Sequence, residues 1–220
     1  MEFLRLDREI REKYPGLEAT LVRLEGVRVE GFSQGLEDYK SRVIEEVAQR
    51  YTLDTLKDNP LVRAYRDFFW KLGVDPTKNR PASEALIRRA LRRRRLPQIN
   101  TCVDAYNLAS METLIPVACF DYDKLHGELV MRSARQGEEF LGIGMRAPVE
   151  LKGGEAVVED QESLVAVYPY RDADYSKVTL DSENVLVMVC GVPGVPREKL
   201  VEATHRTVGL IQRFCGGKVE

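Results

Sequence analysis

The segment that decides the fold runs from residue 99 to residue 132 and reads INTCVDAYNLASMETLIPVACFDYDKLHGELVMR. Its first half is predicted to be a brief helix, because Asp104 can serve as a helix cap and Pro116 cannot continue a helix. Its second half becomes strand-like at residues 117–120 and again at residues 129–132. A helix followed by short strands predicts a mixed organisation of helices and strands around this segment.

On the amino-terminal side of this segment the sequence predicts mainly helices. Apolar residues recur at helical spacing over residues 36–50. A second helix begins at Pro60, with Asn59 as its cap, and a third lies between Pro81 and Pro97. Two short strands, at residues 17–21 and 27–32, are predicted to precede the helices.

On the carboxyl-terminal side further short strands are predicted, and a final helix begins at Pro196. The predicted strands there cover residues 156–158, 164–168 and 185–189. The predicted fold class is therefore α+β, with a compact strand-rich core, a sheet or a sandwich, flanked by helices. We expect residues 1–220 to form a single domain, with residues 1–58 as an amino-terminal extension packed on it.

The overall composition is that of a globular protein, with 44% hydrophobic and 31% charged residues. The first twenty residues lack an apolar run of the length that a signal peptide or a membrane-spanning helix needs, so a soluble, cytoplasmic protein is expected. The four cysteines are far apart and lack the close pairs of structural zinc sites. We predict reduced, mostly buried thiols and neither a metal nor a cofactor.

Positive charge is concentrated in one short segment. Residues 78–95 contain eight cations and one anion, a net charge of +7, so the remaining residues sum to −9 within the formal total of −2. Consecutive arginines on one helix repel one another, which favours an anionic partner such as a phosphate backbone, although charged helix faces are often merely solvated. The residues predicted to bind such a polyanion are Arg88, Arg89, Arg92, Arg93, Arg94 and Arg95.

The segment 99–132 resembles the third and fourth domains of the phenylalanyl-tRNA synthetase beta subunit, the module that edits mischarged tRNA in that enzyme. The matching residues are Ile99, Asn100, Val103, Asp104, Asn107, Pro116, Phe120, Asp121, Lys124, Leu125 and Gly127. A weaker resemblance extends over residues 60–215. It implies a domain that holds the charged 3′ end of tRNA and hydrolyses the ester of a wrong amino acid. A chain of 220 residues has no room for the large catalytic domains, so a free-standing editor acting in trans is expected.

The chain departs from the family's pattern at three pocket positions. Ala118 stands where the bacterial subunits have a histidine, Tyr106 stands where they have a threonine, and Met188 aligns approximately with their editing-pocket glutamate. Three alternatives follow: an editing hydrolase with an altered pocket, a non-catalytic RNA-binding module that lost the pocket chemistry, or a protein that binds a small molecule in the amino-acid pocket alone.

The most polar stretch of the strand-rich half, residues 168–179, corresponds to the family's glycine-rich loop near the editing pocket. An aminoacyl ester is already activated, so its hydrolysis needs an oriented water and a group that holds the substrate ammonium. Asp172 or Asp174 is predicted for the ammonium, and Arg171 for phosphate or terminal adenosine. The predicted catalytic residues are Asp174, Ser176 and Thr179, and the predicted substrate-binding residues are Asn107, Tyr170, Arg171 and Asp172. The alternative is a solvated turn between two strands.

Overall fold

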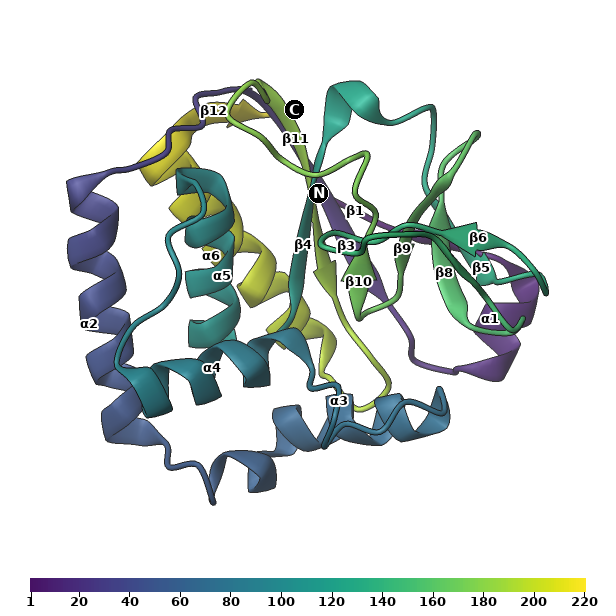
Figure 1. Cartoon of the computed structure of the whole chain (residues 1–220), viewed down its shortest axis with the longest axis horizontal. Coiled ribbons are helices and arrows are strands. Elements are labelled where there is room, and N and C mark those ends of the chain that lie inside the picture. The colour runs from purple at the N-terminus through teal and green to yellow at the C-terminus, as the bar shows by residue number, and fades with distance from the viewer.

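The computed structural model describes residues 1–220 and contains two five-stranded sheets (Figure 1). All pairs in the first, sheet A, are antiparallel, and β3 lies inside it: β11 pairs with one edge of β3, while β1 and β12 pair with the other. Its strands are β1 (Glu2–Phe3), β3 (Ala19–Val27), β4 (Val117–Asp121), β11 (Asn184–Cys190) and β12 (Gly216–Val219).

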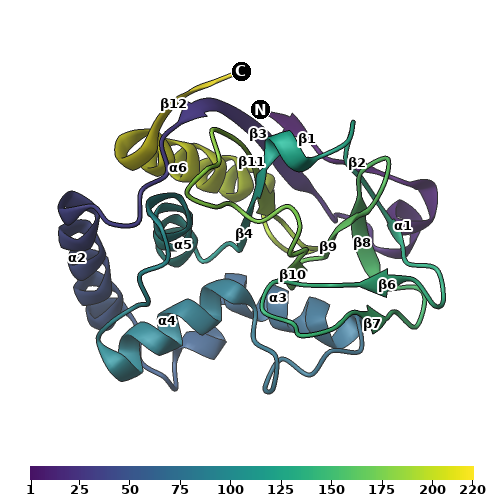
Figure 2. The same cartoon turned by 45° about the horizontal axis from the view of Figure 1, so that its top comes forward.

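The second sheet, sheet B, has the order β10-β9-β8-β5-β2, and only its β2–β5 pair is parallel. It lies on the side of sheet A away from the helices (Figures 1 and 2). Its strands are β2 (Arg5–Leu6), β5 (Val130–Ser133), β8 (Ala156–Glu159), β9 (Leu164–Val167) and β10 (Arg171–Asp172); β6 (Glu139–Phe140) and β7 (Val149–Glu150) form a separate pair.

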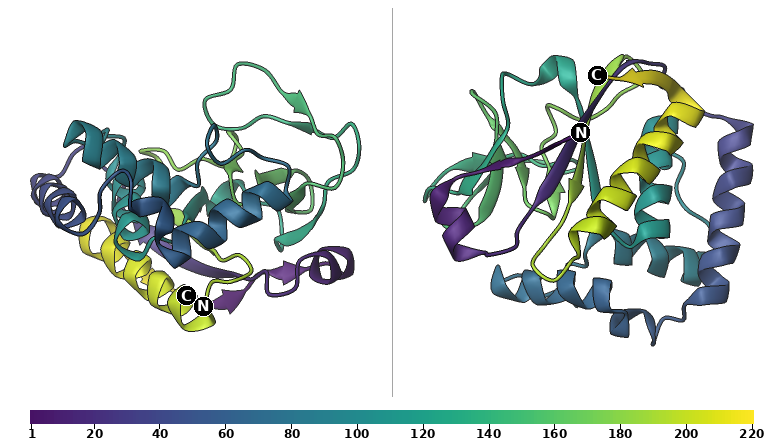
Figure 3. Two further views of the ribbon diagram at one scale, coloured as in Figure 1. Left: turned by 90° about the horizontal axis from the view of Figure 1, so that it is seen from below. Right: turned by 180° about the vertical axis from the view of Figure 1, so that it is seen from behind.

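Five of the six helices cover one face and one end of sheet A, whereas the short helix α1 lies beside β5 of sheet B (Figure 1). The helix α6 lies across the back of sheet A beside α5, and α2 lies outside α5, whereas α3 and α4 run along the lower end of the molecule (Figures 1 and 3). The helices are α1 (Arg8–Lys13), α2 (Gln34–Arg50), α3 (Pro60–Lys71), α4 (Ala82–Arg93), α5 (Thr101–Thr113) and α6 (Arg197–Cys215). The predicted α+β class is confirmed. None of these helices is both long and apolar enough to cross a lipid bilayer.

Local sequence signals set several helix ends as predicted. The Asn59 side chain accepts a hydrogen bond from the Leu61 amide at 3.0 Å, and Pro60 is the first residue of α3. The last helix begins directly after Pro196 and ends at Gly216, whose φ of 72° suits glycine.

Two local predictions are wrong. One strand, β3, stands in place of the two expected at residues 17–21 and 27–32. Seven consecutive residues of β11 pair with residues 19–25 and carry β3 through the supposed turn, whereas residues 28–32 form no strand. Asp104 does not cap α5: Asn100 does, by accepting the Val103 amide at 2.9 Å. Asp104 lies one turn inside the helix, where its buried carboxylate accepts a hydrogen bond from Lys40 at 2.8 Å.

Residues 1–58 contribute to both sheets and to the main core. They supply β1 and β3 to sheet A and β2 to sheet B, and Ile10, Leu24 and Leu36 belong to the same buried apolar cluster as the sheet and helix residues that follow. The extent of the domain stays a prediction. The four cysteines are free and buried, as predicted.

Candidate functional site

A pocket of about 220 Å³ lies where the ends of β4 and β11 in sheet A meet β9 and β10 in sheet B. We call it the inter-sheet pocket. Its floor consists of side chains that are at most 4% exposed: Ala118, Ala166, Tyr168, Met188 and Cys190. Its rim consists of more accessible residues from three segments of the chain: Ala82, Ile143, Tyr170, Arg171 and Asp172.

The floor brings together two of the positions at which the chain departs from the family's pattern. Ala118 on β4 and Met188 on β11 are direct cross-strand neighbours in sheet A. Side chains of directly paired residues point to the same face of a sheet, so both contribute to one patch of the floor. That patch is apolar.

The polar side-chain groups around the floor already have partners. The Tyr168 hydroxyl donates to the Gly191 carbonyl at 2.5 Å, and the Tyr65 hydroxyl donates to the Cys190 carbonyl at 2.6 Å. The Cys190 thiol points to the Met188 carbonyl, with 3.8 Å between sulfur and oxygen. Burial, followed by the nearby Asp172 carboxylate, raises the pKa of Cys190, so this thiol stays protonated and is a poor nucleophile.

Asp172 is the acidic residue of the rim. Burial raises the pKa of its carboxyl to about 7, and the neighbouring Arg171 guanidinium opposes this effect only in part. The backbone of Asp172 is fixed, because its carbonyl accepts the Ile143 amide at 2.9 Å. Burial, followed by the Asp172 charge, also raises the pKa of Tyr106, a residue of α5.

The raised pKa predicts a pH-dependent effect of Asp172→Asn on stability. Because folding raises the pKa of this carboxyl from 3.8 to about 7, the folded state loses stability relative to the unfolded state as the pH rises through that window. We therefore expect equal stability of D172N and the native protein near pH 4. Above pH 7 the variant should be more stable than the native protein. Solvent screening of the partly buried carboxyl limits the expected difference to roughly 1–2 kcal/mol. Urea unfolding at both pH values measures this, and a pH-independent difference would contradict it.

Tyr170 and Arg171 form an accessible part of the rim. The Tyr170 ring is 41% exposed and contacts Phe69 edge-on, with 6.4 Å between ring centroids. The Arg171 guanidinium lies 5.7 Å from the Tyr170 centroid and donates to the Ile143 carbonyl at 3.1 Å. Gly142 makes this approach possible, since a Cβ there would lie 2.3 Å from the Arg171 Cδ. An aromatic face beside a guanidinium is suited to stacking against a base.

The predicted substrate residues Tyr170, Arg171 and Asp172 thus meet at this pocket, whereas Asp174, Ser176 and Thr179 do not line it. Asp174 binds the Lys177 ammonium at 2.8 Å. Ser176 is fully buried and its hydroxyl has no hydrogen-bond partner, and Thr179 lies in a turn stabilised by the Ser182 hydroxyl.

Asn107, the remaining predicted substrate residue, is a partly buried residue of α5 that directly follows Tyr106 and is not among the residues lining the pocket. Sequence reasoning missed the rim residues Ala82 and Ile143, which carry no chemical signal of their own.

The carboxyl-terminal half of α4 and the residues after it carry the predicted arginine strip. Five of its six arginines are exposed and make no ion pair: Arg89, Arg92, Arg93, Arg94 and Arg95. Arginine-lined grooves of about 300 Å³ and 290 Å³ run along this surface. We call these five residues the arginine face.

Arg88 has a different environment. It is partly buried, donates to the Leu53 carbonyl at 2.9 Å, and lies 3.8 Å from the fully buried Glu84 carboxylate. Burial, with help from the Arg80 charge, lowers the pKa of Arg88. Glu84 also binds Arg66 at 3.0 Å, so Arg88 belongs to a structural cluster that holds α4 against α3.

The arginine face and the inter-sheet pocket lie along one helix. Ala82, the first residue of α4, lies on the pocket rim, and the arginines follow toward the other end. A helix of 12 residues is about 18 Å long. Figures 2 and 3 show α4 running from beneath the end of β4 toward α2. The arginine face therefore begins within one helix length of the pocket rim.

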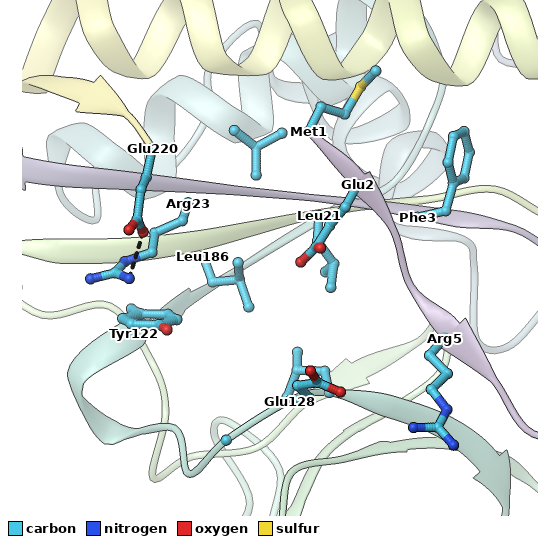
Figure 4. Close-up of a pocket in the computed structure, with 13 residues that line it drawn as sticks. Met1, Glu2, Phe3, Arg5, Leu21, Arg23, Tyr122, Glu128, Leu186 and Glu220 are labelled. Carbon is cyan, nitrogen blue, oxygen red and sulfur yellow. Dashed lines mark ion pairs between the residues drawn. The ribbon is translucent and has the colours of Figure 1, made fainter.

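A larger hollow of about 640 Å³ lies elsewhere on the same face of sheet A, beside β1 and β3. Figure 4 shows the Glu2 and Glu128 carboxylates facing it from opposite sides. Its Arg23 side chain is paired with Glu220 at 2.5 Å and stacks on Tyr122, 3.9 Å from the ring centroid.

Comparison with known proteins places the chain in a family. A family model for the B3/4 domain matches residues 64–216. A phenylalanine–tRNA ligase beta subunit from Fusobacterium nucleatum subsp. nucleatum is 30% identical over 147 residues, which cover 56% of this chain and 18% of that protein. The corresponding subunit from Thermotoga maritima is 31% identical over 120 residues, or 54% of this chain and 15% of that protein. The chain thus spans about a fifth or less of the length of these relatives.

The fold is also similar to a solved structure, an N-terminal fragment of the phenylalanyl-tRNA synthetase beta subunit from Pyrococcus horikoshii. The match has a TM-score of 0.53 and 16% sequence identity, and it covers 98% of this chain and 49% of that chain. The predicted resemblance to the phenylalanyl-tRNA synthetase beta subunit is confirmed. Because the family model spans residues 64–216 of 220, this chain belongs to the B3/4 domain family.

Proposed function

We propose that this protein binds the aminoacylated 3′ end of tRNA and hydrolyses the ester of a mischarged amino acid in trans. The observation that carries the proposal is the placement of the inter-sheet pocket at the start of α4 and of the arginine face along the same helix. The arginine face supplies a sequence-independent attraction for the phosphate backbone. The relatives are tRNA ligase subunits by name, which supports tRNA as the polyanion.

The pocket suits the amino-acid moiety rather than a nucleotide. Its volume of about 220 Å³ is below the 300–1,000 Å³ that is usual for pockets of drug-sized ligands. One side chain can occupy the floor, while the Asp172 carboxylate on the rim can accept hydrogen bonds from the α-ammonium group. The terminal adenosine would then lie on the accessible Tyr170 and Arg171.

Hydrolysis would proceed by attack of water on the ester carbonyl carbon, followed by cleavage of the bond to the terminal ribose oxygen, which takes up a proton. Positioning of the ester and stabilisation of the oxyanion supply most of the acceleration of such a reaction. The first turn of α4 begins at the rim and lacks a side-chain cap, so its amide dipoles can stabilise the oxyanion. The catalytic roles of Asp174, Ser176 and Thr179 stay predictions, and the geometry favours Asp172.

One observation favours an alternative, a tRNA-binding module without catalysis: the pocket floor offers no group to activate water, because the Cys190 thiol is protonated and both tyrosine hydroxyls donate to backbone carbonyls. The two functions separate in one experiment. The protein is incubated with a panel of labelled mischarged tRNAs, and binding and deacylation are followed at several salt concentrations.

Turnover of at least one aminoacyl-tRNA, beyond spontaneous hydrolysis, is the expected result. Salt-sensitive binding without any turnover would support the non-catalytic alternative, and the absence of any tRNA affinity would exclude both functions.

A further inference from the structure

The chemistry of the pocket floor also bears on which amino acid it accepts. The floor side chains are Ala118, Ala166 and Met188 together with Tyr168 and Cys190, and all are at most 4% exposed. A substrate side chain that reaches them is removed from water. Its polar atoms must then find partners in the protein, or lose their hydrogen bonds.

The carbonyl groups next to the floor are occupied. The Met188 carbonyl faces the Cys190 thiol, the Cys190 carbonyl accepts from Tyr65, and the Gly191 carbonyl accepts from Tyr168. Each of these carbonyl groups at the end of β11 thus already accepts one side-chain hydrogen bond, which weakens it as an acceptor for a substrate hydroxyl. The direct neighbours Ala118 and Met188 add no hydrogen-bonding group except the weak thioether acceptor of methionine.

We propose that the inter-sheet pocket selects aminoacyl esters with wholly apolar side chains and discriminates against their hydroxylated isosteres. This inference rests on the proposed binding of aminoacyl-tRNA. The Asp172 carboxylate on the rim serves every substrate equally, because all carry the α-ammonium group, so discrimination falls to the floor. An apolar site rejects an added hydroxyl by a factor on the order of 10² at most, so a 10- to 100-fold preference is expected.

The test uses two isosteric pairs on one tRNA transcript: phenylalanine against tyrosine, and valine against threonine. Each amino acid is attached once as the natural ester and once through a non-hydrolysable amide. We expect kcat/KM for the esters, and affinity for the amides, to favour the apolar member of each pair by about 10- to 100-fold. A ratio of one, or a preference for the hydroxylated member, in both readouts overturns the inference.

The amide arm separates this inference from the proposed hydrolysis. Absence of turnover with a preserved affinity preference would overturn the hydrolase and keep the apolar selectivity. Turnover of all four esters at equal rates, with equal amide affinities, would keep the hydrolase and overturn the apolar selectivity. Equal affinities without any turnover would overturn both.

Variants of the floor supply the second test. Met188→Gln adds an amide to the floor, whereas Met188→Leu keeps it apolar, and Ala118→Ser is a smaller polar change on the neighbouring strand. We expect M188Q and A118S to bring the phenylalanine-to-tyrosine ratio toward one and M188L to retain the native preference. Thermal unfolding checks that each variant folds. A native ratio in both folded polar variants would show that other residues set the selectivity.

Discussion

Replacing Arg92, Arg93, Arg94 and Arg95 together with glutamine should weaken tRNA binding by on the order of 10²- to 10³-fold near 0.1 M salt. These side chains are exposed and make no ion pair, so their loss leaves the fold intact and removes up to four phosphate contacts. The slope of log affinity against log salt concentration should become shallower by about 3 units. Filter binding or fluorescence anisotropy over a salt series measures both quantities.

A matched control removes the same charge elsewhere. Arg8, Arg28, Arg135 and Arg197 have side chains that are 91%, 86%, 75% and 62% exposed and lie outside α4. Their joint replacement with glutamine lowers the net charge equally, so a local site predicts only a small loss of affinity. If both quadruple variants lose the same affinity, binding follows the net charge of the protein and the arginine face is not a site.

Asp172→Asn should lower kcat/KM for deacylation by on the order of 10²-fold at pH 8, because it removes the charged acceptor for the substrate ammonium. In the native protein the carboxyl titrates with a pKa of about 7 and is ionised only above it. The enzyme-dependent kcat/KM should therefore rise about tenfold per pH unit below pH 7 and then fall above about pH 8, where the substrate α-ammonium loses its own proton. The rate of spontaneous ester hydrolysis is measured alongside and subtracted.

Asp174→Asn is the matched control for this variant. Asp174 lies two residues away, is bound to Lys177 at 2.8 Å, and does not line the inter-sheet pocket. We expect D174N to keep the native pH profile, whereas D172N should lose the rise below pH 7. The opposite outcome would assign the ammonium-binding role to Asp174. A native rate in both variants would show that neither carboxylate contributes to the reaction.

Sequence patterns predicted the elements whose signals are local. The Asn59-Pro60 start of α3 and the Pro196 start of α6 depend on residues within a few positions of the helix end, so they could be read directly. The continuous strand β3 could not be predicted in this way, because its extent is set by pairing with β11, which lies more than 150 residues away in the chain. This pairing carries β3 through the predicted turn as far as Glu25, and Gly26 directly after it keeps a left-handed φ of 67°.

The candidate site, like the fold, was predictable from the sequence only where the signal is local. The polarity of residues 168–179 indicated the right loop, but Asp172 and Asp174 look equivalent in the sequence. Their difference comes from tertiary structure: β10 pairs Asp172 with β9 and turns it toward the rim, whereas Asp174 lies beyond the strand beside Lys177. One local feature of the sequence indicated the structural role of Arg88: Glu84 lies one helical turn before it, at the spacing of an ion pair within a helix.

The pairing of Ala118 with Met188 has a consequence for how the pocket can change. Each side chain occupies space next to the other, so a larger residue at one position is tolerated only if the other becomes smaller. Substitutions at the two positions are therefore expected to be non-additive, with a coupling energy on the order of 1 kcal/mol in a double-mutant cycle. A shift of the pocket to another amino acid would then require paired changes on β4 and β11, and single replacements at either strand would be intermediates of reduced fitness.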